Sequence, residues 1–577
     1  MYQPPNYPQP FKVKDNSLYY CVKNKDGYSE QFLCNFLLQV VREIIYDDGA
    51  ESSSRVTIAG IHHTGRPLQT VEMPSSDALK LEWVQDKWGM DCIIENQSRV
   101  RKALQTTADS SNREYVYGIT GWRKIGDQLE FLMPGDEKIT VRLEDKLRRY
   151  GMERSFTQQD LEIAVELLRN PPAVKEVFWP LLAFAFLSPL NHFLEMAGHV
   201  PNFVLLLQGR TGTRKSTLAA LVLSFFGKFT ATNLPMSFRD TANYTLSNAF
   251  ALKDVLTCID DFHPTGRQEE GKLTNTAQSI MRAYGDRTGR GRLRQDCSAM
   301  ASRPPQGNAI ITAEMAPNIG ESGTARYFSL ELMERDVDLR TLSAFQKEAE
   351  DGTLQKCMYG YIQWLKNTYL CDQEMQNLFV LTLRKKFEAY RDDFRNSGVQ
   401  CHGRVPEMVA WLRIGMEMFL NFLVESHCLD ADSSKYFEDE FLSILCRLAV
   451  RQADNIIQDK PTRKFIRNLY ALMDAGQATV TPKNGNHDWI PNTNVGYEDD
   501  TFLYLHSEVA YQKVRKFCED QGESFSLACK ALLKSLAEEG YIDTCGTQNT
   551  KSIRIDGKSK RLLCLYKDKA QQVLGEG

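Results

Sequence analysis

The sequence predicts an α/β fold built around a parallel sheet in the middle of the chain. Between residues 201 and 340, four short apolar runs alternate with stretches of helical pattern; they lie at 203–208, 254–262, 308–314 and 325–332. Strands of a parallel sheet are buried on both faces, so their sequences are continuous apolar runs. In half-exposed strands, apolar and polar residues alternate. The first run leads through a glycine-containing turn into a helical sequence, which is the order of a strand–turn–helix unit.

The pattern changes along the rest of the chain and predicts several further regions. The N-terminal part alternates strand-like runs with one helical run at 30–45, and a helix is expected after the potential capping residue Thr157. Residues 481–500 are rich in Asn, Gly, Pro and Asp, which is typical of a linker. The predicted regions are a mixed α/β domain (1–150), a helical connector (151–200), the α/β core (201–340), a helical region (341–480), the linker (481–500) and a C-terminal domain (501–577).

Composition is that of an ordinary soluble protein. Hydrophobic residues make up 42% and charged residues 25% of the 577 positions. The most apolar run, 177–190, contains two prolines and is fourteen residues long, whereas a membrane span needs about 20 apolar residues. We therefore expect a buried helix there and no membrane partner. The fourteen cysteines include no CxxC pair and do not cluster with histidines, so reduced thiols in an intracellular protein are expected.

The turn at 209–217, with the sequence GRTGTRKST, has the composition of a phosphate-binding loop. Its backbone N–H groups and the positive end of the following helix would form a cradle for anions. Lys215 would reach the β- and γ-phosphates of ATP, and the Ser216 hydroxyl would bind Mg²⁺. The residues expected to hold the nucleotide are Gly209, Gly212, Thr213, Arg214, Lys215, Ser216 and Thr217.

Arg214 stands where this motif usually has its last glycine. Arginine does not share the conformational freedom of glycine. The turn stays compatible with a cradle if Arg214 keeps ordinary helical dihedrals, and its charge would then add to the positive potential near the phosphates.

The later apolar runs end in polar residues that suit the same site. The run at 254–262 carries Asp260 and Asp261 near its end, and the carboxyl ends of parallel strands face the ligand crevice. Asp260 would hold Mg²⁺, and Asp261 would orient the attacking water. Arg326 precedes the core of the fourth run. It is either a solvated charge or a residue that reaches the γ-phosphate bound by a neighbouring subunit.

This order of motifs resembles the core of an AAA+ P-loop ATPase. It is more closely similar to the minichromosome maintenance (MCM) and superfamily-three helicases, and closest to the MCM-like replicative helicases of bacterial mobile elements of the cassette-chromosome type. MCM proteins usually have alanine at the position of Arg214. The segment GTARYFSLEL resembles the MCM "SRF" segment, whose arginine acts across the subunit interface and matches Arg326. The polar sensor at the end of the third strand matches Glu314, with Thr312 as the alternative.

The resemblance implies an ATP-dependent DNA helicase of the bacterial cytoplasm. It would be a homo-oligomer, a hexameric ring, that translocates on single-stranded DNA and replicates a mobile element. ATP and Mg²⁺ are the implied cofactors. Single-stranded and forked DNA, and a primase or other replication proteins, are the implied partners. The implied domain order is an N-terminal domain, the ATPase core, a helical region and a C-terminal winged helix.

Two segments are candidates for DNA contact, because the net charge of −4 leaves only local basic patches for that purpose. Residues 281–303 contain six arginines against two aspartates, and guanidinium groups pair well with phosphate. The C-terminal domain has two helical runs and a basic hairpin turning at Asp556–Gly557, the outline of a winged helix. The residues expected to contact DNA are Arg287, Arg290, Arg292, Arg294, Lys530, Lys534, Lys558 and Lys560.

Two other functions fit parts of the pattern. One is an AAA+ remodeller of protein partners, which an aromatic pore loop would favour and the arginine-rich segment does not. The other is an initiator or regulator that binds ATP, hydrolyses it little, and finds its DNA site with the winged helix. Arg214 and the absence of a glutamate directly after Asp260 support that second alternative.

Overall fold

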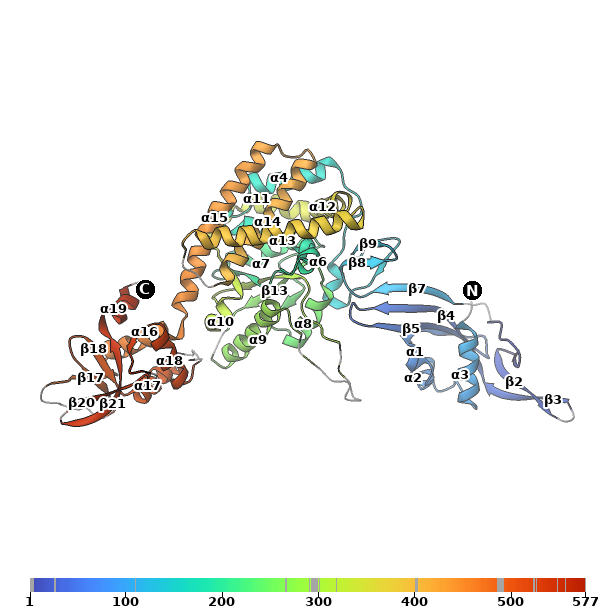
Figure 1. The fold of residues 1–577 in the computed structure, drawn as a ribbon. Coiled ribbons are helices and arrows are strands. Elements are labelled where there is room, and N and C mark those ends of the chain that lie inside the picture. The colour runs from blue at the N-terminus through green and yellow to red at the C-terminus, as the bar shows by residue number, and fades with distance from the viewer. Residues whose placement is uncertain are drawn as a thin grey trace. The chain divides into compact units, whose positions relative to one another are not determined.

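The computed structural model describes residues 5–575, apart from 25–26, 109–110, 265–266, 290, 292–298, 300, 318, 400–402, 485–491, 522–524, 526, 547 and 556. The chain divides into two compact units (Figure 1). The first unit consists of Met1–Arg154, Phe250–Lys253 and Arg290–Arg303, and the second of Ser155–Ala249, Asp254–Gly289 and Pro304–Gly577. Both contain sheets and helices, so the predicted α/β class is confirmed.

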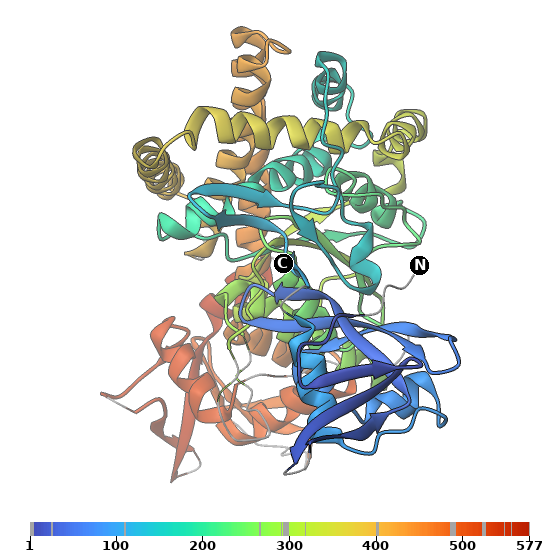
Figure 2. The ribbon, with the colours of Figure 1, turned by 90° about the vertical axis from the view of Figure 1, so that its right-hand side faces the viewer.

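The first unit is built on a mixed five-stranded sheet in the order β10-β7-β4-β5-β6. Its strands are β4 (Phe36–Asp47), β5 (Ser52–His62), β6 (Pro67–Pro74), β7 (Asn112–Tyr117) and β10 (Thr140–Val141). The short helices α1 (Ser75–Ala78), α2 (Trp83–Trp88) and α3 (Gln97–Thr106) lie beside this sheet, which is drawn in blue in Figure 2. Smaller strands complete the unit: β1 (Phe11–Lys14), β2 (Ser17–Asn24), β3 (Gly27–Cys34), β8 (Gly121–Ile125) and β9 (Gln128–Leu132).

The helix predicted at 30–45 is wrong, because this stretch forms the end of β3 and most of β4. Strand β4 lies between β5 and β7. Phe36, Leu37 and Leu38 are consecutive and all fully buried, so the strand is covered on both faces. A strand covered on both faces loses the alternating pattern that would distinguish it from a buried helix.

The second unit contains the predicted parallel sheet, in the order β12-β13-β14-β11-β15. All four strand pairings are parallel, so the carboxyl ends of the strands meet at one edge. The strands are β11 (Val204–Gln208), β12 (Met236–Ser237), β13 (Leu256–Phe262), β14 (Asn308–Ala313) and β15 (Tyr327–Glu331). The helices between them are α7 (Lys215–Leu223), α8 (Ala242–Ala251), α9 (Arg267–Asp286) and α10 (Glu321–Thr324).

A layer of helices covers this core. Helix α4 (Gln158–Arg169) begins with the predicted cap, because the Thr157 side chain and Asp160 form a capping box. The apolar run forms α5 (Lys175–Leu187), which is buried as predicted. The stretch Lys175–Met196 is long and apolar enough to cross a membrane by length and composition, and 94% of its most apolar window is buried inside the protein. The other helices are α6 (Asn191–Met196), α11 (Leu339–Glu350), α12 (Thr353–Tyr369), α13 (Gln373–Asn396), α14 (Arg404–Glu425) and α15 (Ala431–Gln458).

The C-terminal part of the second unit has its own core of helices against a sheet. The sheet contains β16 (Thr479–Pro482), β17 (Asn494–Glu498), β18 (Phe502–Leu505), β19 (Ile542–Asp543) and β21 (Lys558–Tyr566), with β20 (Lys551–Ile555) paired to β21. Its helices are α16 (Pro461–Asp474), α17 (Ser507–Asp520), α18 (Cys529–Glu538) and α19 (Lys567–Gly575).

The linker predicted at 481–500 is therefore wrong at both of its ends. Strand β17 pairs with β16 and β18, and its Val495 is fully buried. Gly496 lies so close to β18 that an added Cβ would be 2.1 Å from the Tyr504 carbonyl oxygen. Glycine and asparagine there serve close strand packing rather than chain flexibility. The middle of the predicted linker, 485–491, lies outside the described residues.

Two glycine-to-alanine substitutions should change the stability of the second unit in opposite directions. A Cβ on Gly415 of α14 would lie 2.3 Å from the Ala183 carbonyl oxygen of α5, and overpacking of this kind costs about 1–3 kcal/mol. A Cβ on Gly271 of α9 would meet nothing within 4 Å, and alanine favours a helix by about 1 kcal/mol over glycine. Calorimetry should show a lower melting temperature for Gly415→Ala and an unchanged or higher one for Gly271→Ala. A Gly415→Ala protein as stable as wild type would contradict this packing.

Candidate functional site

The carboxyl edge of the parallel sheet carries a cavity of about 250 Å³ between the turn after β11 and the ends of β13 and β14. The edge lies where ligands bind in open α/β sheets. Predicted site residues from all three segments line it: Gly212, Arg214, Lys215, Ser216, Thr217, Asp261, Thr312 and Glu314. The structure thus brings together residues that are up to 102 positions apart in the sequence.

Arg214 does not keep ordinary helical dihedrals. Its φ is 71° and its ψ is 23°, in the left-handed region, and helix α7 begins at the next residue. The loop therefore demands the backbone of a glycine at this position, although an arginine supplies it. A side chain in this conformation costs roughly 1–2 kcal/mol. The Arg214 side chain nevertheless lines the cavity.

Lys215 is folded back onto the loop that carries it. Its Nζ donates hydrogen bonds to the carbonyl oxygens of Gly209 (2.5 Å) and Arg210 (3.0 Å). Burial lowers the pKa of Lys215, and the nearby carboxylates of Glu314, Asp260 and Asp261 oppose that effect in this order. The ammonium group thus sits at the mouth of the loop among three acids, where a phosphate would become its partner.

Asp260 is the point at which the three segments are tied together. Its Oδ1 accepts hydrogen bonds from Ser216 Oγ (2.7 Å) at the start of α7 and from Thr312 Oγ1 (2.5 Å) on β14. The Thr312 hydroxyl also accepts a bond from the Asp261 backbone N–H (3.0 Å). A carboxylate and a serine hydroxyl in contact are the oxygen ligands that Mg²⁺ prefers, so Asp260 and Ser216 fit the metal role predicted for them.

Asp261 points toward the rim of the cavity. The register of β13 against β14 shifts between Ile259 and Phe262, and Asp261 has a φ of 68°. Irregularities of this kind re-aim a side chain. The Asp261 carboxylate is 47% exposed and lies 3.6 Å from the guanidinium of Arg239, which is 86% exposed.

Glu314 links the end of β14 to the phosphate loop. Its carboxylate accepts a hydrogen bond from Thr211 Oγ1, and its Oε2 lies 2.6 Å from His263 Nδ1. The hydrogen bond from Thr211 is the largest cause that lowers the pKa of Glu314; burial opposes it, and the charge and hydrogen bond of His263 lower the pKa further. The sequence analysis did not single out Thr211, Arg239 or His263. The only signal for His263 was its place directly after the acid pair.

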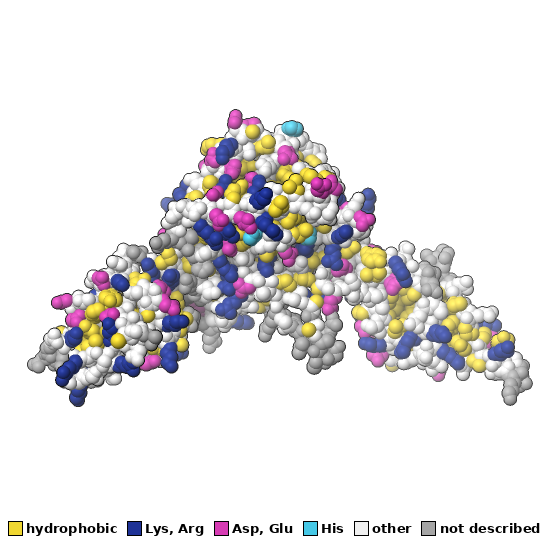
Figure 3. Space-filling model, in the orientation of Figure 1, with side chains coloured by type: hydrophobic (Ala, Val, Ile, Leu, Met, Phe, Trp, Pro, Cys, Tyr) yellow, Lys and Arg dark blue, Asp and Glu magenta, His cyan; other side chains and the backbone are white. Residues whose placement is uncertain are grey.

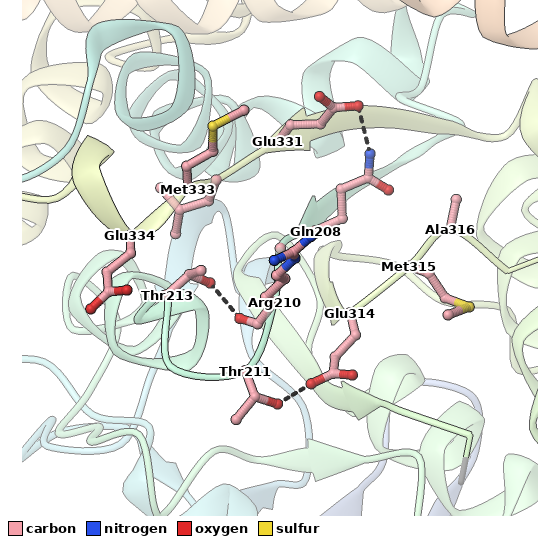
Figure 4. A pocket seen from close by; sticks show the side chains of 12 residues that line it. Gln208, Arg210, Thr211, Thr213, Glu314, Met315, Ala316, Glu331, Met333 and Glu334 are labelled. Atoms are coloured by element: carbon pink, nitrogen blue, oxygen red, sulfur yellow. Dashed lines mark hydrogen bonds between the residues drawn. The ribbon is translucent and has the colours of Figure 1, made fainter. Parts of the chain in front are cut away.

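A second, larger cavity of about 700 Å³ adjoins the first and shares Thr211 and Glu314 with it (Figure 4). Gly209 and Thr213 of the phosphate loop line this second cavity. Met315 and Met333 stand on opposite sides of it in the figure, and both are among the exposed large apolar side chains. The Thr211–Glu314 hydrogen bond therefore lies where the two cavities meet.

Arg326 lies away from this site, at the amino-terminal edge of the sheet. Its carbonyl oxygen accepts a bond from Val204 N at the start of β11. Its guanidinium is 3.0 Å from the carboxylate of Asp286 and also bonds Ser322. The side chain is only 12% exposed. A Cβ on Gly285 would lie 2.6 Å from Arg326 Cγ, so the arginine packs closely on the end of α9.

The arginine-rich segment is only partly described. Arg290, Arg292 and Arg294 lie outside the described residues. The prediction that Arg287 contacts DNA is wrong for this structure, because its guanidinium donates to the carbonyl oxygens of Pro201 (2.7 Å), Pro305 (3.0 Å) and Gly307 (2.7 Å). Burial lowers the pKa of Arg287 to about 10. Arg287 directly follows α9, and its guanidinium binds main-chain carbonyls of other segments there.

The lysines predicted to contact DNA in the C-terminal part differ in their surroundings. Lys530 and Lys534 are both exposed on α18 and lie one turn apart. Lys558 is exposed at the start of β21. Lys560 instead donates a 2.5 Å hydrogen bond to the Tyr497 hydroxyl and lies 4.8 Å from the centre of that ring, so it is committed within its own sheet. Figure 3 shows basic and acidic side chains interspersed over the helical region, whereas Lys and Arg side chains gather around β20 and β21.

One cluster brings a histidine and a cysteine together in space although they are far apart in the sequence. His62, Asp91 and Cys92 of the first unit offer ligand atoms within 4.8 Å of one another. Their polar atoms already have protein partners: Arg66 lies 2.6 Å from the Asp91 carboxylate, and Asn35 Nδ2 lies 3.3 Å from His62 Nε2. No spacing pattern in the sequence indicates this cluster, because 29 residues separate His62 from Asp91.

Comparison with known proteins identifies a solved structure with the same fold. No protein-family model and no curated protein matches the chain. The solved structure of SCCmec type IV Cch, described as an active helicase, matches over 98% of this chain and 99% of its own, with a TM-score of 0.56 and 13% identity. The chain has the fold of this helicase. The similarity to cassette-chromosome helicases that the sequence predicted is thereby confirmed at the level of the fold.

Two structures of JCV helicase, each with a bound small molecule, match a smaller part of the chain. Each match covers 44% of this chain and has a TM-score of 0.21 at 13% identity. They cover 70% and 71% of the JCV chains. A similarity this low carries no argument about this chain.

Two substitutions at Arg214 should separate its backbone conformation from its charge. Arg214→Gly removes both the charge and the cost of the left-handed side-chain conformation, so the free energy of unfolding should rise by about 1 kcal/mol. Arg214→Ala removes only the charge and should leave stability within about 0.5 kcal/mol of wild type. Thermal unfolding of the two variants checks this difference. Equal stability of the glycine and alanine variants would contradict the left-handed conformation.

Thr312→Val should weaken the binding of Mg²⁺ that is predicted for Ser216 and Asp260, while changing the shape of the side chain little. The variant leaves Asp260 and the Asp261 backbone N–H without the hydroxyl that joins them, and loss of such a supporting bond costs about 10–100-fold in metal affinity. We expect nucleotide binding to need that much more Mg²⁺. The matched control is Thr257→Val on β13, because the Thr257 hydroxyl is buried and has no hydrogen-bond partner among the residues that the structure describes. Its Mg²⁺ dependence should stay that of wild type.

Proposed function

We propose that the protein is an ATP-dependent DNA helicase that uses Mg²⁺. The observation that carries the proposal is the contact of Asp260 with Ser216 and Thr312, which joins a phosphate-binding loop to two neighbouring strand ends. That arrangement has the parts of a nucleoside-triphosphate hydrolase: an anion cradle, a lysine, and a hydroxyl–carboxylate pair for the metal. The shared fold with a helicase supports DNA as the second partner.

Each residue of the phosphate loop has a distinct task in this proposal. Gly212 and the left-handed Arg214 turn the backbone so that the N–H groups at the start of α7 face the β- and γ-phosphates. Lys215 exchanges its carbonyl partners for phosphate oxygens. Ser216 and Asp260 hold Mg²⁺, whose positive charge offsets the charge of the phosphates. Thr312 is thereby a residue that positions Asp260.

The architecture supports an AAA+ core. The strand that leads into the phosphate loop, β11, lies between β14 and β15, and the acid-pair strand β13 follows on the other side of β14. The polar group at the end of β14 is then next to both the loop and the acid pair, as the sensor of such a core requires. A ring of identical subunits, most simply a hexamer in the bacterial cytoplasm, belongs to the same proposal. Contact with a primase stays a prediction from the resemblance.

The C-terminal part is proposed to be a winged helix that contacts DNA. Helix α18 presents Lys530 and Lys534 on one exposed face, and the β20–β21 hairpin carries the exposed Lys558 at its turn. A recognition helix followed by a basic hairpin is the arrangement that places one element in a groove and the other on the backbone. The arginines of 290–294 are proposed as the contacts with the translocating strand.

An initiator or regulator that binds ATP with little hydrolysis is the second candidate. The left-handed Arg214 favours it, because a loop that stores strain is a departure from an efficient cradle. So does the exposed, Arg239-paired position of Asp261. This candidate predicts nucleotide binding with slow turnover that DNA hardly changes.

Hydrolysis of ATP with and without single-stranded DNA separates the two candidates. A helicase should hydrolyse ATP faster when single-stranded DNA is present. Lys215→Ala should lower this rate by roughly 10²-fold or more, since it removes a charge that stabilises the transition state. The control is Arg169→Ala, a substitution at an exposed position near the end of α4. Binding of ATP without DNA-stimulated hydrolysis in the wild type would favour the regulator instead.

Arg326 is proposed to act on the nucleotide of a neighbouring subunit, because it lies at the edge of the sheet opposite its own phosphate loop. Arg326→Ala should then reduce hydrolysis by about 10³-fold. A mixture of Arg326→Ala and Lys215→Ala chains should regain activity, because some interfaces pair an intact Lys215 with an intact Arg326. A mixture as inactive as its components would contradict action between subunits.

A further inference from the structure

Two carboxylates reach the small cavity from neighbouring strands without taking part in the Ser216–Asp260 contact. Asp261 comes from β13 and Glu314 from the end of β14. Hydrolysis needs one of them to orient water against the γ-phosphate. The acid pair alone makes Asp261 the candidate, but the surroundings of the two side chains differ in ways that the sequence does not show.

Asp261 is the more exposed of the two. Its carboxylate is 47% exposed and lies 3.6 Å from the guanidinium of Arg239, which is itself 86% exposed. Glu314 is 25% exposed and is fixed from two sides, by Thr211 of the phosphate loop and by His263. A group that orients water is more effective when its own position is fixed and bulk water is excluded. Both criteria favour Glu314.

Glu314 also lies at the end of the cavity where the transferred phosphate belongs. Thr211, to which it is bonded, is part of the loop that encloses the phosphates. Among the three acids that act on Lys215, Glu314 has the largest electrostatic effect. Lys215 is the residue that reaches the γ-phosphate, and Lys215 and Glu314 line the same small cavity.

The contacts of Glu314 leave it able to bind water. A carboxylate offers about four lone-pair positions, and the described bonds from Thr211 and His263 use one on each oxygen. Asp260 is less suitable, because its Oδ1 already accepts bonds from Ser216 and Thr312. Glu314 remains as the acid with both a fixed position and free acceptor positions.

We propose that Glu314, held by His263, is the catalytic residue that orients and deprotonates the attacking water. The inference rests on the proposed hydrolysis of ATP at this site. The water oxygen forms the new bond to the γ-phosphorus, and the bond from that phosphorus to the β,γ-bridging oxygen breaks. ADP leaves with the electron pair of that bond, and the proton of the water passes to the Glu314 carboxylate. Asp261 then serves with Arg239 at the rim and not as the base.

Two isosteric substitutions rank the candidates directly. Glu314→Gln should lower the kcat for ATP at least about 100-fold, the usual contribution of a general base. Asp261→Asn should lower it less than about tenfold. Binding of a fluorescent ATP analogue should stay within a few-fold of wild type in both variants, because neither residue belongs to the phosphate cradle. His263→Asn should lower kcat with little change in KM, and should add nothing further to Glu314→Gln.

Each outcome of these measurements either supports or overturns the proposed role of Glu314. The proposal is supported if the kcat of Glu314→Gln is far below that of Asp261→Asn while both variants still bind the analogue. The reverse ranking, or equal losses, overturns it and returns the role to Asp261. Additive losses for His263→Asn and Glu314→Gln overturn the role of His263 in holding Glu314. A wild-type protein that binds the analogue but does not hydrolyse ATP, with or without DNA, overturns the proposed function and this inference together.

Discussion

The hydrogen bonds that Ser216 and Thr312 donate to Asp260 are the contact on which the site depends. They fix the start of α7, the end of β13 and the end of β14 to one oxygen atom. Because β11, which leads into α7, and the strands β13 and β14 are parallel, their carboxyl ends share one edge of the sheet, and this contact joins the three segments there. Through it, the loop after β11 is joined to the polar ends of β13 and β14. A hydroxyl on β14 thus holds the Asp260 carboxylate, whereas Glu314 is held separately by Thr211 and His263.

The sequence predicted the central sheet and the residues of the site because both leave local signals. Apolar runs predicted the strands β11, β13, β14 and β15, and the sequence GRTGTRKST predicted the phosphate-binding loop. Contacts between distant residues left no such signal. Thr312 is 52 positions from Asp260 and Glu314 is 103 positions from Thr211. Which polar residue bonds which acid therefore became visible only when the strands were placed side by side.

Other predictions failed because composition does not determine surroundings. Arg287 belongs to a basic stretch, but it lies at the end of α9, where carbonyl groups take up its guanidinium. The Asn- and Gly-rich stretch 481–500 supplies strand β17, in which glycine permits close packing. Arg214 shows the same limit for dihedral angles: the backbone has the conformation of the missing glycine, and the favourable contacts around it must offset the cost.

The most direct test of the account is strand displacement from a forked DNA duplex in the presence of ATP and Mg²⁺, with wild type and Lys215→Ala chains compared at equal concentration. The account predicts that the wild-type protein separates the strands and that Lys215→Ala binds the same fork but leaves it paired. A wild-type protein that binds the fork and hydrolyses ATP without separating the strands would contradict a helicase. It would show that the nucleotide drives a different movement.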